Sequence, residues 1–209
     1  MRGTRILLLR HGTTDANTSG LFLGATDALL SEHGRLEAQR LGERLKNVDV
    51  KAILSSDLSR AKETAQAVAA HHPHITPTID PRIREMHLGD LEGVPAKEVQ
   101  TNHPELMQKW LDNPGNTRMP GESAETLLEV QVRAWSGLET LAESHPGETV
   151  IAVSHTFCIL SVLCHILGMP LGHFRRMFIH RASITEITWD KFGPTLRRFN
   201  DIAHLEALK

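Results

Sequence analysis

Apolar positions in the first part of the chain follow two different spacings. Residues 4–10 ("TRILLLR") and 49–57 ("DVKAILSSD") are short apolar runs, which is the pattern of buried strands. Between them, residues 31–48 repeat apolar side chains at helical spacing, and those near one face are Leu36, Leu41, Leu45 and Val48. This order predicts a strand, a helix and a second strand, which together form a βαβ unit.

Two further helices are predicted to begin at polar residues that can cap them. Residues 55–72 predict a helix capped by Ser56 or Asp57. Residues 123–148 predict a longer helix that is capped by Ser123 and stops before Pro146.

Four later segments complete the alternation of strands and helices. Residues 148–155 ("ETVIAVSH") are typical of a buried strand, and residues 183–189 and 194–200 predict two late strands. Residues 156–170 are apolar nearly all round a helix but too short to cross a membrane, which favours burial between layers. The pattern predicts the α/β class, as a three-layer α/β/α sandwich with a mainly parallel sheet.

Residues 86–121 differ in composition from the rest of the chain. They contain several Pro and Gly turn signals and only weak helical periodicity, so we expect a small helical cap insertion over the sheet edge. The full length of 209 residues fits a single domain, residues 1–209, which can bury roughly 70% of its unfolded surface.

The charge balance argues against a nucleic-acid partner. The chain has 23 Lys and Arg against 25 Asp and Glu, a net charge of −2, and contains no basic run. No segment approaches the roughly 20 apolar residues of a membrane helix, and the N-terminal apolar run is too short for a secretion signal. We therefore expect a cytoplasmic protein with no membrane partner.

Cysteines and clustered histidines do not indicate a metal site. Cys158 and Cys164 lack C-x-x-C spacing and are expected to be buried thiols. His71, His72 and His74 ("HHPH") follow a helix end next to a proline, which favours a solvated turn. No metal ligand is predicted.

Cationic and imidazole side chains stand near the ends of three predicted strands. Arg10 and His11 end the first, Arg60 lies just beyond the second, and His155 ends the strand at 148–155. Because the carboxyl ends of strands form the ligand crevice of open α/β sheets, we expect these side chains to share one pocket. Guanidinium groups match phosphate oxygens, so the expected ligand is a phosphoryl group. Fixed cations can supply the charge stabilisation, and no cofactor is predicted.

Five motifs of the chain together resemble one family. They are "RHGTTDAN", "SSDLSRAKETA", "REMHLGDLEG", "PGES" and "VSH", in that order. Their order and spacing are similar to those of the histidine phosphatase superfamily, in the branch that resembles cofactor-dependent phosphoglycerate mutase. The resemblance covers nearly the whole chain.

The resemblance implies a phosphohistidine mechanism. His11 would take the phosphoryl group onto a ring nitrogen and pass it to water. Arg10, Arg60 and His155 would hold the phosphate and its transition-state charge. Neutral donors would come from Asn17 and Thr14, although Asn17 is also a common turn residue.

Glu85 matches the acid of the family. It would protonate the departing alkoxide and then deprotonate the attacking water. Asp90 and Glu92 lie in the same segment and are alternative acids. Glu85 could instead form an ion pair with Arg82 or Arg84.

Two residues depart from the pattern of the family. Thr156 follows His155 where many members have Gly, which places a β-branched side chain beside the phosphate site. Arg181 stands where the family often has Asn, and it either reaches the substrate or caps the strand.

Hydrolysis of a small phosphate monoester is the favoured function. The mutases that the chain resembles are longer and have Tyr-Gly after the acid, whereas this chain has no tyrosine. Phosphoglycerate mutase-type transfer and a non-catalytic phosphate-binding module are the alternatives, but such a module would typically have lost His11, an arginine or the acid. Ser154 lacks a G-x-S-x-G context and is not expected to be a nucleophile. The expected partners are a small phosphorylated metabolite and, in a homodimer, a second copy of the chain.

Overall fold

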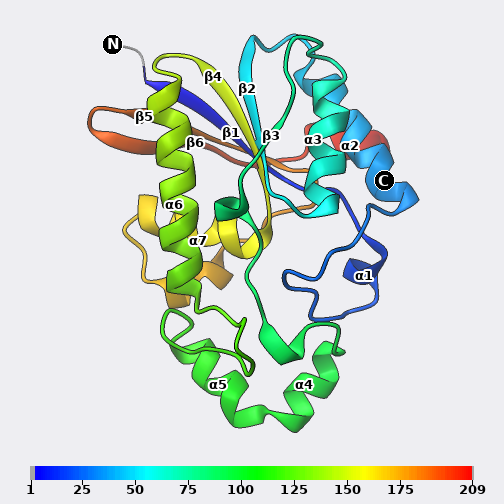
Figure 1. The fold of residues 1–209 in the computed structure, drawn as a ribbon, viewed down its shortest axis with the longest axis vertical. Helices are drawn as coiled ribbons and strands as arrows, with labels where there is room; N and C mark the ends of the chain where they lie inside the picture. Colours follow the sequence, from blue (N-terminus) through cyan, green and yellow to red (C-terminus); the bar gives the residue numbers. More distant parts are fainter. Residues whose placement is uncertain (1–2, 209) are drawn as a thin grey trace.

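The computed structural model of the protein describes residues 3–208. Within these residues, one six-stranded sheet has the order β3-β2-β4-β1-β5-β6 (Figure 1). Its strands are β1 (Thr4–Arg10), β2 (Val50–Ser55), β3 (Thr78–Ile79), β4 (Thr149–Ser154), β5 (Ile184–Asp190) and β6 (Gly193–Asp201). The neighbours β3, β2, β4 and β1 run parallel, whereas β5 is antiparallel to β1 and to β6. The sheet is therefore mainly parallel, as the sequence predicted.

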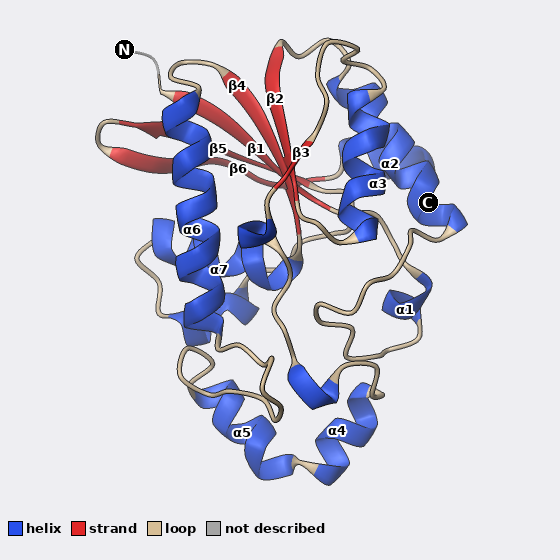
Figure 2. Ribbon diagram, viewed as in Figure 1, coloured by secondary structure: helices blue, strands red, loops and turns tan. Residues whose placement is uncertain are grey.

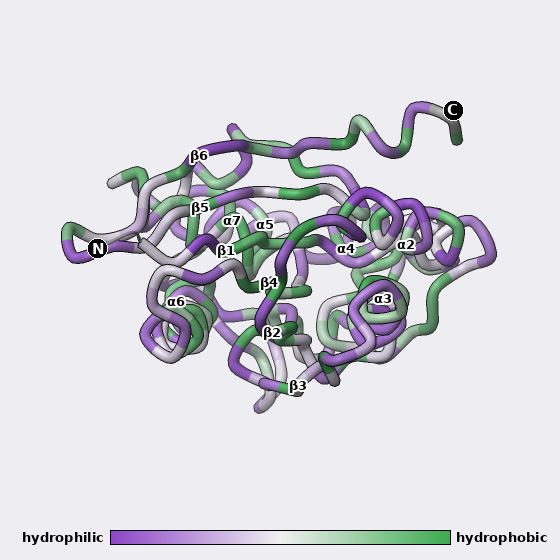
Figure 3. The backbone as a smooth tube through the Cα atoms, turned by 90° about the horizontal axis from the view of Figure 1, so that it is seen from above, coloured by the Kyte–Doolittle hydropathy of each residue, from purple (hydrophilic) through white to green (hydrophobic). Residues whose placement is uncertain are grey.

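Helices cover both faces of the sheet (Figure 2). One face carries α2 (Glu32–Leu45), α3 (Ser59–Ala69) and the short helix η4 (Ala203–Leu208), and the other carries α6 (Leu127–Ser144) and α7 (Thr156–Ile166). Because successive side chains of a strand point to opposite faces, Leu7 and Leu9 of β1 pack with the first group, and Ile6 and Leu8 with the second. The view from above shows the sheet between these layers (Figure 3), which confirms the three-layer sandwich.

The helical insertion contains α4 (Ala96–Asn102) and α5 (Pro104–Asp112), which lie beyond the carboxyl ends of the parallel strands (Figure 1). Trp110 of α5 packs edge-on against Phe157 of α7, with ring centroids 5.7 Å apart. This aromatic contact attaches the insertion to the helix that follows β4. The remaining helical turns are α1 (Asp15–Thr18), η1 (Pro81–Ile83), η2 (Gly89–Leu91) and η3 (Leu171–Arg176).

The predicted cap of α3 is wrong. The helix begins at Ser59 after Leu58, whose apolar side chain cannot cap it, so neither Ser56 nor Asp57 is the cap. The backbone N–H of Ser59 instead donates to Asp27 Oδ1 at 2.7 Å. A contact between distant segments therefore replaces the local cap.

The start of α6 also differs from the prediction. Its cap is Thr126 and not Ser123, because Thr126 and Glu129 form a reciprocal capping box. The N–H of Thr126 donates to Glu129 Oε2 at 2.7 Å, and the N–H of Glu129 donates to Thr126 Oγ1 at 3.3 Å.

One apolar position of α2 was placed on the wrong face. Leu41 and Leu45 are buried as predicted, but the Leu36 side chain is 44% exposed. The next residue of α2, Glu37, is buried instead, because its carboxylate accepts the backbone N–H of Thr13 at 2.7 Å. A hydrogen bond to a distant loop thus outweighs the local apolar pattern.

Both cysteines are buried, which confirms the expectation of buried thiols. Burial raises the pKa of Cys158 to about 12 and that of Cys164 to about 11.

Candidate active site

The register of β1 and β4 places two histidines side by side. Arg10 pairs with Ser154 at the carboxyl ends of these parallel strands, so His11 and His155 leave the sheet together. Their ring centroids lie 5.0 Å apart, and both side chains are buried. The sheet therefore delivers both histidines to the crevice at its carboxyl end.

His11 is held in one tautomer by its own turn. Nδ1 lies 2.6 Å from the carbonyl oxygen of Gly12, and because a carbonyl only accepts, Nδ1 carries the proton and Nε2 keeps its lone pair. Burial, and then the charges of Arg60 and Arg10, lower the pKa of His11 well below its usual value. The ring is neutral, which is the form that a nucleophile needs.

Gly12 lets this turn lie close to α2. A Cβ at Gly12 would stand 2.6 Å from the carbonyl oxygen of Gly34, which is backbone and cannot move aside. Only glycine therefore allows the chain after His11 to pack there.

Arg60 and His155 are hydrogen-bonded to each other, and the ring of His155 lies beside that of His11. The Arg60 side chain is 1% exposed, and its Nε donates to His155 Nδ1 at 3.3 Å. Because Nδ1 accepts, His155 Nε2 carries the proton and donates to Ser56 Oγ at 2.8 Å. Burial lowers the pKa of His155 well below its usual value, and the charge of Arg60 acts in the same direction, so this ring is neutral as well.

The guanidinium of Arg60 is also fixed by the loop before α2. Its Nη1 and Nη2 each donate at 2.8 Å, to the carbonyl oxygens of Thr26 and Gly24. Each of these nitrogens retains a second N–H for a ligand.

Arg10 is bound less completely. Its Nη1 donates to the carbonyl oxygen of Ile179 at 2.7 Å, while its buried Nε has no partner within residues 3–208. Burial, and then the charge of Arg181, lower the pKa of Arg10 to about 10. A cation with unpaired N–H groups favours an anionic ligand.

Glu85 follows η1 and points its carboxylate at the start of α7. Its Oε1 accepts the backbone N–H groups of Met86 at 3.0 Å and Phe157 at 3.1 Å. Burial raises the pKa of Glu85 and outweighs the opposing effects of these hydrogen bonds and of Arg60. The environment thus favours the protonated carboxyl that a general acid needs.

The alternative assignments near Glu85 find other partners in the structure. Arg82 pairs with Asp80 and Arg84 with Asp57, so neither arginine neutralises Glu85. Glu92 accepts the backbone N–H of Ala25 at 2.8 Å, and neither it nor the exposed Asp90 lines the pocket of His11.

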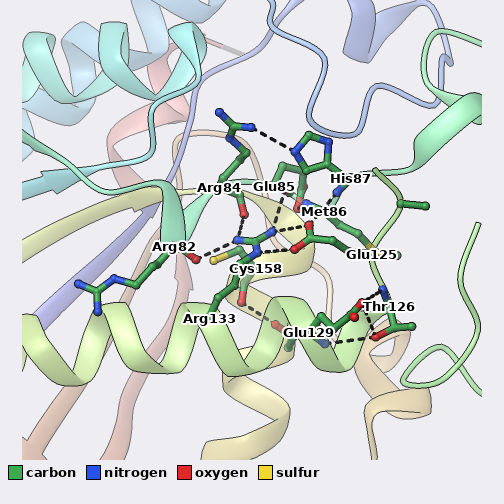
Figure 4. A network of polar contacts seen from close by, with 12 residues as sticks. Arg82, Arg84, Glu85, Met86, His87, Glu125, Thr126, Glu129, Arg133 and Cys158 are labelled. Atoms are coloured by element: carbon green, nitrogen blue, oxygen red, sulfur yellow. Dashed lines mark hydrogen bonds and ion pairs between the residues drawn. The ribbon is translucent and has the colours of Figure 1, made fainter. Parts of the chain in front are cut away.

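A network of polar contacts holds the segment around Glu85 (Figure 4). Arg133 of α6 donates to the carbonyl oxygens of Arg82, Arg84 and Glu85 at 2.8, 2.7 and 3.0 Å. The same guanidinium binds the carboxylate of Glu125 through Nε at 2.7 Å and Nη2 at 2.8 Å. Arg133 thus fixes the backbone on which Glu85 stands.

Sequence reasoning missed Arg133 and Glu125. Arg133 lies at helical spacing between the buried residues Val130 and Gly137, so it falls on the buried side of α6. A charged residue on that side was the signal available in the sequence. The acidic partner was not, because it lies eight residues away and before the helix begins.

The predicted neutral donors take different places. Thr14 is fully buried and caps α1, and its hydroxyl accepts the N–H of Asn17 at 3.2 Å. Oδ1 of Asn17 accepts the backbone N–H of Thr14 at 3.3 Å. Asn17 lines the pocket that contains His11, whereas Thr14 does not.

These groups surround a pocket of about 240 Å³. Its polar lining includes Arg10, His11, Asn17, Arg60 and Glu85. Leu21, Phe22, Leu23, Leu88 and Phe157 supply apolar walls, and Gly24 and Thr156 complete the lining.

Two further findings concern residues 3–208. No three His, Cys, Asp or Glu side chains in this range gather closely enough to hold a metal ion. No helix in the same range is long and apolar enough to span a membrane.

Comparison with known proteins identifies the family. The sequence model of the histidine phosphatase superfamily (branch 1) matches residues 6–202. Phosphoglycerate mutase-like protein 4 of Arabidopsis thaliana is 31% identical over 202 residues, which cover 96% of this chain and 86% of that protein. The chain therefore belongs to the histidine phosphatase superfamily.

Solved structures agree with this assignment. Bacillus stearothermophilus YhfR has a TM-score of 0.90 and 32% identity, covering 97% of this chain and 100% of that chain. A mycobacterial glucosyl-3-phosphoglycerate phosphatase, solved in complex with VO3, has a TM-score of 0.85 and 26% identity, with the same coverage of 97% and 100%. The match extends over nearly the whole chain.

Proposed function

We propose that the protein hydrolyses a small phosphate monoester through a phosphohistidine on His11. The observation that carries this proposal is the neutral His11 ring, whose Nδ1 proton is bound to Gly12 and whose Nε2 is left as the nucleophile. The pocket of His11 also holds Arg10, Arg60 and Glu85. A nucleophile, two cations and an acid are the groups that such a reaction uses.

In the first step, Nε2 of His11 attacks phosphorus and the bond to the ester oxygen breaks. Glu85 gives its proton to the departing alkoxide, because its raised pKa keeps that proton available. Arg10 and Arg60 stabilise the charge on the phosphoryl oxygens, and Asn17 adds a neutral donor. His155 orients Arg60 through the contact between Nδ1 and Nε.

In the second step, the carboxylate of Glu85 takes a proton from water as the water oxygen attacks phosphorus. The bond between phosphorus and Nε2 breaks, phosphate leaves, and Glu85 is protonated again. His11 returns to its neutral form with the proton still on Nδ1. The cycle needs only cations that the chain itself supplies.

Phosphoryl transfer of the mutase type is the second candidate. The name of the Arabidopsis relative supports it, whereas the mycobacterial neighbour supports hydrolysis. The absence of tyrosine from the sequence also favours hydrolysis. Incubation with 3-phosphoglycerate and 2,3-bisphosphoglycerate separates the two, because a mutase produces 2-phosphoglycerate and a phosphatase releases inorganic phosphate.

The mechanism is tested by rapid quenching during turnover of 4-nitrophenyl phosphate. We expect acid-labile, alkali-stable phosphate on His11, and no turnover by His11→Ala. Phosphate on Ser154, or full activity of His11→Ala, would contradict the proposal. Activity is expected to survive exhaustive treatment with EDTA, and a loss restored by magnesium or zinc would argue against cation supply by the protein alone.

A further inference from the structure

A second cavity, of about 380 Å³, lies beside the pocket of His11 and shares Arg10 and Thr156 with it. Arg175, His180 and Arg181 also face this cavity, and none of the described residues that line it is acidic. The rest of its wall is apolar and comes from α7, η3 and the loop before β5. The cavity is therefore an extension of the site with an excess of positive charge.

Two of these arginines have buried N–H groups that are not hydrogen-bonded. Nε of Arg10 and Nε of Arg181 have no partner within residues 3–208. The Arg181 guanidinium forms a long hydrogen bond, from Nη2 to the carbonyl oxygen of Asn17 at 3.4 Å. Leaving a buried charged donor unpaired is unfavourable, so these guanidinium groups favour a nearby acceptor.

The positive charges of Arg10 and Arg181 also repel each other. After burial, the charge of Arg181 is the main cause of the lowered pKa of Arg10. Glu85 and Glu37 act on Arg10 in the opposite direction, but each already accepts backbone N–H groups. A bound anion would offset the remaining repulsion.

Arg181 does not belong to the pocket in which the phosphoryl group would react. That pocket is lined by Arg10, Arg60 and Asn17, whereas Arg181 lines the second cavity. Arg10 lies at the boundary and contributes to both. A substrate with its phosphoryl group against His11 can therefore reach Arg181 with another part of the molecule.

We propose that Arg181 and Nε of Arg10 form a second anion site, which takes a carboxylate or a second phosphate of the substrate. This inference rests on the proposed function and narrows the substrates to phosphate monoesters with a second anionic group.

The test uses substrates that differ in the second anionic group. 3-Phosphoglycerate has a carboxylate where glycerol 3-phosphate has a hydroxymethyl group, and fructose 1,6-bisphosphate has a phosphate that fructose 6-phosphate lacks. We expect the wild-type protein to show a higher kcat/KM for the more anionic member of one pair. The pair that responds distinguishes a carboxylate from a phosphate.

Substitution of Arg181 should reduce this preference. Arg181→Gln is expected to lower the kcat/KM of the preferred anionic substrate about 10–100-fold, chiefly through KM, which is the effect of one charged hydrogen bond. Arg181→Lys should restore only part of it, because an ammonium ion lacks the planar fork of arginine. Arg197→Gln is the matched control, since it removes the same charge from an exposed position on β6.

Equal losses for both members of each pair in Arg181→Gln would overturn the inference, as would a wild-type protein that does not distinguish them. Phosphorylation of His11 by 4-nitrophenyl phosphate tests the proposed function separately, because that substrate has no second anionic group. A protein that forms phosphohistidine but shows no effect of Arg181 would refute the second anion site and leave the mechanism standing.

Discussion

Arg133 and Arg10 are both largely buried arginines near the pocket, and they differ in what their guanidinium groups contact. Arg133 binds three carbonyl oxygens and both oxygens of Glu125. Arg10 binds the carbonyl oxygen of Ile179, and its Nε has no partner within the described residues. The two groups lie on different sides of the site, one beneath Glu85 and the other facing the second cavity with Arg181.

These contacts indicate that Arg133 stabilises the fold and that Arg10 and Arg181 can bind a ligand. A buried charge must be paired, so complete pairing by the protein leaves Arg133 nothing to give a substrate. Arg10 and Arg181 are paired incompletely within residues 3–208, and a bound anion would accept their remaining N–H groups. We therefore expect substitutions on the Glu85 side to affect proton transfer and stability, and those on the Arg10 side to affect anion binding.

The largest effect is expected for Glu85→Gln. Histidine phosphorylation by alkyl or sugar phosphates should slow about 10²–10⁴-fold, because their alkoxides leave poorly without a proton. With 4-nitrophenyl phosphate, whose phenolate departs unaided, we expect a burst of nitrophenol and then slow turnover with accumulated phosphohistidine. Rapid-quench measurements on both substrate types check this difference.

Alkyl substrates serve as the control for the burst and should show none. An equal first-step loss for both types would mean that Glu85 only shapes the pocket. The proton would then come from Asp90 or Glu92, with a rearrangement that brings one of them into the pocket.

Arg133→Met should destabilise the protein by about 3 kcal/mol, because it leaves the partly buried carboxylate of Glu125 without its charged partner. Urea unfolding measures this change. The double variant Arg133→Met with Glu125→Leu removes both charges and is expected to recover much of the loss. If the double variant is as unstable as the single one, the unpaired charge is not the cause.

Arg133 should also act on catalysis through Glu85. In Arg133→Lys, histidine phosphorylation by alkyl phosphates should slow more than phosphorylation by 4-nitrophenyl phosphate. A lysine cannot bind three carbonyl oxygens and the carboxylate together, so it would not hold Glu85 in place to protonate an alkoxide. A purely structural role would reduce both activities equally.

Ligand binding should stabilise the Arg10 side. Inorganic phosphate at 100 times its Kd is expected to raise the free energy of unfolding by about 2.7 kcal/mol, measured by urea unfolding with and without phosphate. Arg10→Met should lose most of this gain. A full gain in Arg10→Met would show that phosphate binds elsewhere.

The last effect concerns pH. His11 and His155 have pKa values that burial lowers well below 6.5, so they stay neutral when folded but take up protons when unfolded. Stability should therefore be complete above about pH 6.5 and fall on acidification, by about 1.4 kcal/mol per pH unit for each histidine. The pKa of Glu85 is raised and acts in the opposite sense, with stability lost as the pH rises through that pKa.

The single variant His155→Asn isolates one histidine. Unfolding measured between pH 5 and pH 7 should show a pH slope smaller by one proton than in the wild-type protein. An unchanged slope would mean that His155 is protonated in the folded state.

The sequence by itself determined every strand of the sheet within residues 3–208 except the short β3, together with the helices α2, α3, α6 and α7 and the order of these elements. Apolar runs such as Leu7 to Leu9 specify buried strands because both faces of a parallel sheet are covered. The placement of Arg10 and His11 at the end of such a strand also followed, since strand ends meet at one edge of the sheet. These predictions depend on local periodicity and on general rules of α/β topology.

Only the tertiary structure decided the contacts between distant segments. The cap of α3 comes from Asp27, and the exposure of Leu36 depends on a hydrogen bond from Thr13 to its neighbour Glu37. Neither contact can be predicted from the local spacing of apolar and polar residues, because the two partners are far apart in the sequence.

The same reason explains what the sequence left open at the site. The sequence marks Arg133 as a charged residue on the buried side of a helix and Arg181 as a departure from the family pattern, but it does not distinguish a paired guanidinium from an unpaired one. The fold brings Glu125 and three carbonyl oxygens to Arg133, and it leaves Nε of Arg181 buried with no acceptor among the described residues. The state of a buried charge depends on which groups surround it in space, and that is settled only when the whole chain has folded.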